Sequence, residues 1–371
     1  MRILIVSNSA WNIRNFRGGL IRHLISVGHE VWSLCPEDTV TLIELESLGC
    51  QVMGLRNVDA RGKNPIRDLK LLLELKSAFF RIMPDLIISF TPKINIYSGM
   101  AAARLRISLI GNITGMGSTF SESLGFPRYI QSLYRMAMRR AQFVAFHNQD
   151  DLQYFLEHGL IQSNQGVHIP GSGVNTEEFA PVRRIESVRR FLFIGRILPE
   201  KGIVPFLEAA LSLHSIYPEV QWKVVGYRGE TWIKGLIDRC SGCSAISIEK
   251  FTDNSREEFE WTDAFVLLSR REGLSRALLE AMSMQRIPIV SNVPGCRDVV
   301  EHNLSGIVMH SQDTAALVQQ MEELIRMDAD SVERMSKAAR ARIIQSYADT
   351  MIHAKYDQLI QSLATNSVIH G

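Results

Sequence analysis

The sequence lacks long apolar runs and is poor in cysteine. No stretch approaches the ~20 apolar residues that cross a bilayer, and the first residues, Arg-Ile-Leu-Ile-Val-Ser, lack the apolar core and cleavage site of a signal peptide. The chain has 5 cysteines among 371 residues, an odd number that favours reduced thiols. We therefore expect a cytoplasmic protein, which would reach a membrane only as a peripheral protein on the inner face of the plasma membrane.

Metal- and dinucleotide-binding motifs are also missing. Cys240 and Cys243 form a lone C-x-x-C with no second pair and no histidine pair nearby, which gives little support for a metal or redox role. Gly18 and Gly19 do not belong to a G-x-G-x-x-G fingerprint, which disfavours a dinucleotide-dependent oxidoreductase. We expect neither a metal ion nor a bound cofactor.

The charge is nearly balanced overall but unevenly distributed. A net charge of +2 does not indicate binding to bulk nucleic acid. Residues 1–150 hold 18 Lys and Arg against 11 Asp and Glu, whereas residues 151–371 hold 23 against 28. This asymmetry predicts that the first half meets an anionic surface.

The length and the pattern of apolar runs predict the fold class. A chain of 371 residues is too long for one ordinary core, so two domains are expected. Apolar runs of strand length, such as Arg2–Ser7, Asp85–Phe90 and Ser108–Ile113, alternate with helical stretches along both halves. This alternation predicts an α/β protein with doubly wound parallel sheets, which bind ligands beyond the carboxyl ends of their strands.

The stretch Ser269–Met282 carries the strongest functional signal. The apolar run Ala264–Leu268 before it predicts a buried strand, and Ser275 is a good N-cap for a helix. Glu272 and Glu280 would then lie on either side of the helix start. Free N–H groups at a helix start suit a phosphate, and carboxylates accept hydrogen bonds from sugar and ribose hydroxyls. The pattern indicates a nucleotide-sugar site; the plainer alternative is two solvated acids near a helix start.

A second loop with two cations follows the predicted strand Arg190–Gly195. Arg196 and Lys201 lie between that strand and a helix. They suit a diphosphate, because Arg grips phosphate oxygens as a fork and Lys acts as a point charge. Taken alone, such a loop is more often a solvated turn.

Together these strings resemble a known family. The string S-R-R-E-G-L-S-R-A-L-L-E-A-M at 269–282 resembles the signature of the family-four glycosyltransferases, which have the GT-B fold and retain the anomeric configuration. The string I-P-G-S-G-V-N-T-E-E-F at 169–179 resembles the linker between the two lobes of that fold. The resemblance implies two Rossmann-like lobes facing a cleft. Residues 1–172 would bind the acceptor, residues 173–349 would bind the donor, and a last helix at about 350–371 would cross back onto the first lobe.

The resemblance also implies roles for individual residues. Arg196 and Lys201 match the cations that bind the donor diphosphate, Glu280 would accept from the ribose hydroxyls, and Glu272 would face the donor sugar. Phe251 lies where the family forms its base pocket, although a packing role is as well supported. The implied catalytic residues are Glu272, Arg196 and Lys201, and the implied donor-binding residues are Glu280, Gly273, Leu274, Ser275 and Phe251.

Three segments of the first half are candidates for the acceptor side. Their residues are Asn15, Arg17, Gly18, Gly19, Lys93, Asn95, Asn112 and Thr114. The first four would open a helix after the first strand, where small residues either admit a ligand or simply connect strand and helix. The segments 91–97 and 112–117 resemble a subgroup that builds bacterial surface polysaccharides on polyprenyl-diphosphate carriers. Many family members have a donor-contacting histidine in the second of these segments; Asn112 or Thr114 would have to replace it here.

Residues 120–140 combine aromatic and basic side chains. Such a segment can lie on an anionic membrane surface, and a core-facing helix with a solvated basic face gives the same pattern. No myristoylation or prenylation motif is present.

The predicted function is retaining, metal-independent transfer of a sugar from a nucleotide-diphosphate sugar, with UDP favoured by the resemblance alone. The acceptor would be a polyprenyl-diphosphate-linked saccharide in bacterial surface-glycan synthesis, and no nucleic-acid partner is expected. The alternatives are a sugar-nucleotide epimerase of the same fold and a non-catalytic protein that binds nucleotide sugars.

Overall fold

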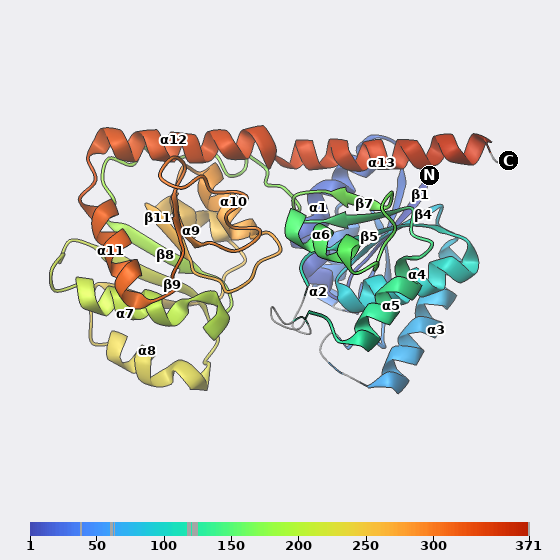
Figure 1. The fold of residues 1–371 in the computed structure, drawn as a ribbon, viewed down its shortest axis with the longest axis horizontal. Helices are drawn as coiled ribbons and strands as arrows, with labels where there is room; N and C mark the ends of the chain where they lie inside the picture. The colour runs from blue at the N-terminus through green and yellow to red at the C-terminus, as the bar shows by residue number, and fades with distance from the viewer. Residues whose placement is uncertain (38, 60–61, 63, 117–119, 121–124, 370–371) are drawn as a thin grey trace. The chain divides into compact units, whose positions relative to one another are not determined.

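The computed structural model describes residues 1–37, 39–59, 62, 64–116, 120 and 125–369. The chain forms two compact units, which we call the first and second domains. The first contains Met1–Ser172 and Asp349–Gly371, and the second contains Gly173–Ala348. Each domain is a parallel sheet with helices on both faces (Figure 1). The predicted α/β class with two doubly wound sheets is confirmed. No helix of the described residues has the length and apolar character needed to cross a membrane.

The first domain is built on a seven-stranded parallel sheet. Its spatial order is β3 (Gln51–Leu55), β2 (Glu30–Pro36), β1 (Arg2–Val6), β4 (Leu86–Phe90), β5 (Ser108–Ile113), β6 (Phe143–Phe146) and β7 (Gly166–His168). The strand order therefore reverses between β1 and β4, which pair in parallel.

Alternating side chains of β1 divide the first domain's core into two layers. Ile3 and Ile5 pack with α1 (Ala10–Ser26), α2 (Thr39–Glu46) and α13 (Asp349–Ile369). Leu4 and Val6 pack on the other face with the remaining helices of the domain. Those helices are α3 (Pro65–Ile82), α4 (Pro92–Leu105), α5 (Arg128–Met138) and α6 (Gln149–Glu157). Burial on both faces explains why these strands are almost continuously apolar.

The predicted start of the first helix was wrong. We expected a loop over 8–14 and a helix opening at Asn15, but α1 begins at Ala10. Ser9 is its N-cap, with its hydroxyl accepting from the Asn12 N–H at 3.3 Å. Asn15, Gly18 and Gly19 therefore lie inside the helix rather than at its opening.

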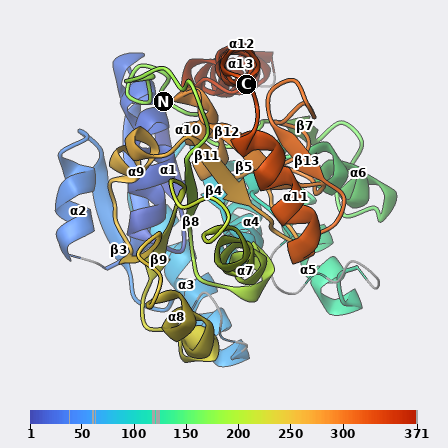
Figure 2. The ribbon, with the colours of Figure 1, turned by 90° about the vertical axis from the view of Figure 1, so that its left-hand side faces the viewer.

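The second domain has a six-stranded parallel sheet with the same reversal. Its spatial order is β10 (Ile246–Lys250), β9 (Gln221–Tyr227), β8 (Arg190–Ile194), β11 (Ala264–Leu267), β12 (Ile287–Ser291) and β13 (Ile307–Met309). One face is covered by α7 (Ile203–Leu213), α8 (Lys234–Cys240) and α11 (Thr314–Ile325). The other is covered by α9 (Ser255–Trp261), α10 (Arg276–Ser283) and α12 (Ala329–Ser346). In Figure 2, α8 lies at the lower end of this domain and α12 at its upper end.

Candidate active site

The strand order of the second sheet reverses between β8 and β11. These strands are neighbours and run parallel. The helix after β8, α7, packs on the face that Phe193 occupies, whereas the helix after β11, α10, packs on the face of Leu192. The two connecting loops thus leave the sheet toward opposite faces, the arrangement at which open α/β sheets bind ligands. Arg196 and Lys201 lie on the first loop, and Glu272 lies on the second.

The loop after β8 begins with a close backbone contact that requires glycine. Gly226, near the end of β9, has a φ of +122°, and a Cβ atom there would lie 2.0 Å from the Gly195 carbonyl oxygen. The Gly195 N–H also donates to the Val225 carbonyl at 3.0 Å. The next residue, Arg196, is exposed and makes no hydrogen bond or ion pair within the part of the chain that the structure describes. Its guanidinium group is available to an anion.

The two loops are held against each other by a second glycine. Gly202 follows the short 3-10 turn η1 (Pro199–Lys201) and has a φ of +79°. A Cβ atom at Gly202 would lie 2.5 Å from the Cβ of Leu268, and the Arg270 N–H donates to the Glu200 carbonyl at 2.8 Å. This close packing brings Lys201 to the loop after β11.

Lys201 and Glu272 form a direct ion pair. Their side chains are only 18% and 13% exposed. The Ser269 hydroxyl donates to the same Glu272 carboxylate oxygen at 2.7 Å. The Ser269 carbonyl accepts from the Ser291 hydroxyl and from the Gln312 amide, the latter at 2.7 Å. The geometry presents one cation and one hydrogen-bond acceptor side by side, as a diphosphate joined to a sugar would require.

A third loop supports the turn before α10. Gly295, in the loop after β12, has a φ of +75°, and a Cβ atom there would lie 2.2 Å from the Gly273 carbonyl oxygen. The adjacent Cys296 is buried, and burial, followed by the nearby Glu272 carboxylate, raises the pKa of its thiol well above the usual range. Cys296 is therefore a neutral packing group beside the site.

The start of α10 has the predicted cap. The Ser275 hydroxyl accepts from the Leu278 N–H at 3.4 Å, and Leu274 is partly buried against the core. The other N–H groups of the first turn have no acceptor within the helix, which is the condition for binding a phosphate.

Glu280 lies one and a half turns into α10 and is 6% exposed. Its two carboxylate oxygens accept from Arg276 Nε at 2.7 Å and from the Ser255 hydroxyl at 2.9 Å. Burial raises the pKa of Glu280, and the Arg276 charge opposes that shift. Each oxygen can accept a further hydrogen bond, so ribose hydroxyls could join these partners.

Phe251 is separate from this group. It follows β10 and is 40% exposed, with the Arg228 guanidinium 4.5 Å from its ring centroid. A half-exposed ring is not a core residue, so of the two predicted roles the structure disfavours simple packing.

Sequence reasoning missed three residues that orient the site. Ser269 holds Glu272, and Ser255 and Arg276 hold Glu280. The four-residue spacing of Arg276 and Glu280 on one helix was a usable signal. Ser255 comes from α9, so its contact with Glu280 had no local signal.

Four acceptor candidates are buried in the first domain: Arg17, Gly18, Asn95 and Asn112. Arg17 is 4% exposed, and its guanidinium lies 3.9 Å from the Phe90 ring centroid. Asn95 and Asn112 are 1% and 0% exposed. Their amides are used internally: Asn95 accepts from Ser89 at 2.7 Å and donates to the Asn112 carbonyl at 2.6 Å.

The remaining acceptor candidates, Asn15, Gly19, Lys93 and Thr114, are only partly buried. Lys93 is paired with Asp68 at 2.7 Å. The Asn15 amide donates to the Trp11 carbonyl at 2.9 Å. Packing does not require glycine at positions 18 and 19, because the nearest atom to an added Cβ would lie 3.5 Å away at either position. Thr114 lies just beyond β5 and is partly exposed.

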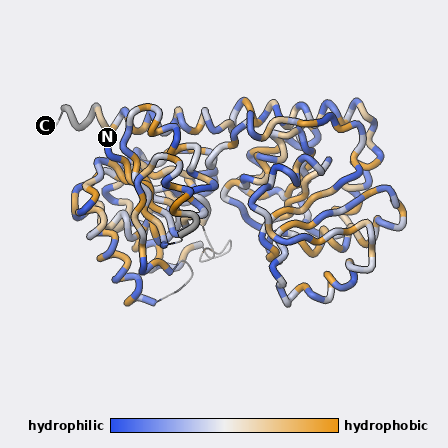
Figure 3. The backbone as a smooth tube through the Cα atoms, turned by 180° about the vertical axis from the view of Figure 1, so that it is seen from behind, coloured by the Kyte–Doolittle hydropathy of each residue, from blue (hydrophilic) through white to orange (hydrophobic). Residues whose placement is uncertain are grey.

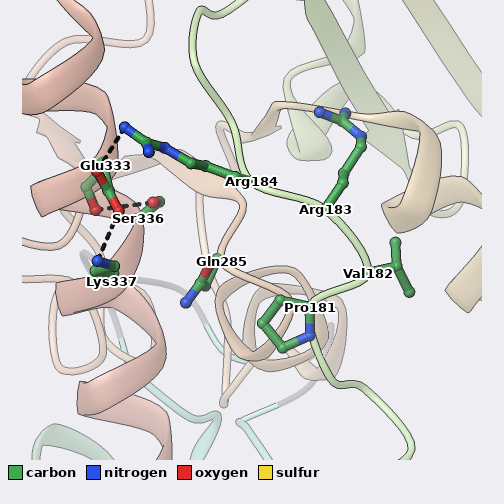
Figure 4. A pocket seen from close by; sticks show the side chains of 8 residues that line it. All are labelled: Pro181, Val182, Arg183, Arg184, Gln285, Glu333, Ser336 and Lys337. Atoms are coloured by element: carbon green, nitrogen blue, oxygen red, sulfur yellow. Dashed lines mark hydrogen bonds and ion pairs between the residues drawn. The ribbon is translucent and has the colours of Figure 1, made fainter.

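Within the described residues, neither a metal-binding cluster nor the cavity found in the second domain coincides with the predicted site. No cluster of three or more His, Cys, Asp or Glu that could hold a metal is found among the described residues. Two closely spaced acids, Asp328 and Asp330, lie at the start of α12 and do not form such a cluster. Asp328 instead caps the helix by accepting from the Ser331 N–H at 2.9 Å. A cavity of about 330 Å³ in the second domain is lined by none of the predicted site residues (Figure 4). Its Glu333 is already paired with Arg184 and Lys337.

Comparison with known proteins decides the family. Residues 174–342 match the family model described as glycosyl transferases group 1, and residues 2–148 match the model described as glycosyl transferase 4-like. The chain belongs to the GT-B glycosyltransferases. The first match contains the whole arrangement of Arg196, Lys201, Glu272 and Glu280.

Individual relatives of this glycosyltransferase are distant but extend over its length. A Campylobacter jejuni N,N'-diacetylbacillosaminyl-diphospho-undecaprenol α-1,3-N-acetylgalactosaminyltransferase is 24% identical, covering 99% of this chain and all of the relative. An Escherichia coli UDP-Gal:α-D-GlcNAc-diphosphoundecaprenol α-1,3-galactosyltransferase is 23% identical over 76% of each chain. The crystal structure of Anabaena HepE with UDP and glucose superposes with a TM-score of 0.80 at 18% identity, covering 98% of this chain and 100% of HepE. The fold is therefore shared, and the enzyme is a glycosyltransferase of the hexosyltransferase type.

Proposed function

We propose that this glycosyltransferase transfers a sugar, with retention of anomeric configuration and without a metal ion, from a UDP-sugar to a polyprenyl-diphosphate-linked saccharide. The product would be an intermediate of a bacterial surface polysaccharide. The observation that carries the proposal is the ion pair of Lys201 and Glu272 on the two loops where the strand order of the second sheet reverses. Arg196 lies on the first of these loops and has no ion pair within the described residues.

The chemistry follows from the charges. Breaking the anomeric C–O bond leaves negative charge on the nucleotide diphosphate. Arg196, Lys201 and the start of α10 would stabilise that charge without rearranging at the moment of reaction. Glu272 would accept a hydroxyl of the donor sugar and stabilise positive charge that develops at the anomeric carbon. The acceptor hydroxyl would attack on the face that the diphosphate leaves, and a departing phosphate oxygen would take its proton.

The choice of acceptor and donor rests on the relatives. Two named relatives act on sugars linked to diphospho-undecaprenol, which supports a lipid-linked acceptor. A Staphylococcus aureus relative is named for capsular polysaccharide biosynthesis. UDP is bound in the HepE crystal structure and is part of the E. coli relative's name, whereas a Xanthomonas oryzae relative is named for GDP-mannose. UDP is thus the better supported nucleotide.

A two-step experiment tests the proposal. Thermal denaturation with a panel of UDP- and GDP-sugars identifies the donor, because a ligand that binds only the folded state raises the Tm. The selected donor is then incubated with a polyprenyl-diphosphate-linked saccharide, with and without EDTA, and the new linkage is read by NMR. We expect transfer that EDTA does not abolish and an anomeric configuration identical to that of the donor. Inversion, or abolition by EDTA, would contradict the mechanism. Interconversion of the donor sugar without an acceptor would instead identify an epimerase.

A further inference from the structure

Helix α3 of the first domain carries a second apolar face that is exposed among the residues that the structure describes. Its inner side packs in the core through Leu71, Leu75, Phe79 and Ile82. Its outer side shows five large apolar residues that are 56–74% exposed. These are Ile66, Leu69, Leu73, Phe80 and Met83, the last being the C-cap. We call these five residues the α3 stripe.

The α3 stripe follows one side of the helix. At 100° per residue, Ile66, Leu69, Leu73 and Phe80 fall within about 60° of one another, roughly opposite the buried residues. From Ile66 to Met83 the helix rises by roughly 25 Å. Hydrophobic and hydrophilic positions alternate along the whole of α3 in Figure 3. An exposed apolar face of this length marks an interaction surface rather than a chance exposure.

The unpaired charged side chains of α3 beside the α3 stripe are cations, among the described residues. Its two acids are engaged: Asp68 pairs with Lys93 at 2.7 Å, and Glu74 accepts from the backbone N–H groups of Arg56 and Asn57 at 2.8 and 3.0 Å. The cations beside the stripe are Lys70, Lys76 and Arg81. All three are exposed and make no ion pair within the described residues.

Helix α5, which packs on the far side of α4 from α3, also has basic residues on its outer side. α3, α4 and α5 line the same face of the first sheet (Figure 1). The α5 side chains of Tyr134, Ala137 and Met138 are buried, so this helix is anchored in the core. Its outer side presents the exposed Tyr129 and Met136 together with Arg128 and Arg139. Of the segment 120–140, residues 121–124 lie outside the described residues.

We propose that the α3 stripe docks the protein on an anionic membrane surface. Apolar side chains would enter the boundary between headgroups and acyl chains, and Lys70, Lys76 and Arg81 would meet the anionic headgroups. A second copy of the chain is the less suitable occupant, because pairing two such faces brings cations against cations. The choice of a membrane rests on the proposed lipid-linked acceptor, which would lie in that surface.

The test is binding of the full chain to vesicles of phosphatidylcholine with or without phosphatidylglycerol, measured by co-sedimentation at low and high salt. The test variant is Leu69→Ser/Leu73→Ser/Phe80→Ser. The matched control is Ile216→Ser/Leu304→Ser/Ile344→Ser, which removes three exposed apolar residues of the second domain, originally 60%, 56% and 48% exposed. Melting temperatures establish that both variants are folded.

We expect the parent and the control to bind the anionic vesicles and the α3 variant to partition at least tenfold less. The variant Lys70→Gln/Lys76→Gln/Arg81→Gln should lose about fivefold per charge at low salt and little at high salt. Binding of the α3 variant equal to that of the parent would overturn the proposal. So would a parent dimer, seen by analytical ultracentrifugation, that the α3 variant breaks without any change in vesicle binding.

The docking surface and the proposed function fail in different ways. A folded α3 variant should still transfer sugar to a short-chain, detergent-soluble diphosphate-linked acceptor as fast as the parent. Stripe-dependent vesicle binding without any sugar transfer would refute the proposed function but not the docking surface. Sugar transfer without stripe-dependent vesicle binding would refute the docking surface but not the proposed function.

Discussion

Replacing Glu272 by Gln should separate nucleotide binding from sugar transfer. In the structure without a donor, the Glu272 carboxylate neutralises Lys201. A diphosphate that approaches Lys201 must displace this carboxylate and is repelled by it. The Gln side chain has nearly the same shape and can still accept from Ser269, but it carries no charge. UDP should therefore bind the variant more tightly than the parent, while transfer should slow.

The burial of the pair sets the size of the effect. The side chains are 18% and 13% exposed, so the pair is neither a surface contact nor a fully buried one. Surface pairs contribute ~0–1 kcal/mol and breaking a buried pair costs ~3–5 kcal/mol, so we take roughly 1–2 kcal/mol. That is a gain of roughly 5- to 30-fold in UDP affinity. Loss of one well-placed group at the reacting centre costs about 10²–10³ in kcat.

Calorimetric titration with UDP and a transfer assay read the two effects separately. The matched control is Glu258→Gln, because Glu258 forms a similarly buried pair with Lys223 at 3.1 Å, with side chains 12% and 15% exposed. That control should leave UDP affinity unchanged. If Glu272→Gln weakened UDP binding as much as it slowed transfer, Glu272 would be a binding residue for the nucleotide itself, and the reasoning would be refuted.

Three further predictions concern other parts of the molecule. Lys201→Ala should lower kcat by about 10²–10³, since it removes a cation from the departing diphosphate; turnover within threefold of the parent would remove that role. Tyr356→Phe should lower the free energy of unfolding by ~1–3 kcal/mol in denaturant titrations, because the Tyr356 hydroxyl donates to the buried Asn112 side chain at 2.6 Å; an unchanged midpoint would contradict this. Glu280→Gln should stabilise the protein more at pH 7 than at pH 4 while weakening donor binding. Burial raises the folded-state pKa of Glu280, so its ionisation costs stability as the pH rises through the interval between the unfolded and folded pKa values. Equal melting-temperature shifts at both pH values would count against that assignment.

Local sequence signals predicted the strands and the start of α10. Runs such as Ala264–Leu267 are apolar because both faces of the sheet are covered, and Ser275 is a cap that any helix start would favour. The start of α1 was missed although Ser9 is an equally good cap. The polar residues after it and the pair Gly18 and Gly19 resembled a loop, and only packing against α13 shows that they are helical.

Contacts between distant residues could not be predicted. Arg17 reads as a basic residue of α1, and its guanidinium packs on Phe90, which lies at the end of β4 and 73 residues away in the sequence. Asn112 read as a ligand-binding amide, and its partner Tyr356 is 244 residues further along the chain. The α3 sequence is apolar on two sides, and the pattern alone did not indicate which side would be covered.

The return of the chain to the first domain at Asp349 affects the order in which the two domains can fold during synthesis. α13 belongs to the first domain but is synthesised after the second domain. Ile352, Tyr356 and Ile360 fill the layer beside α1, and until they leave the ribosome that layer has no cover. The second domain, by contrast, is complete once Ala348 has emerged. The loops of the second domain should thus acquire their shape before α13 is made, whereas the first domain must wait for that helix.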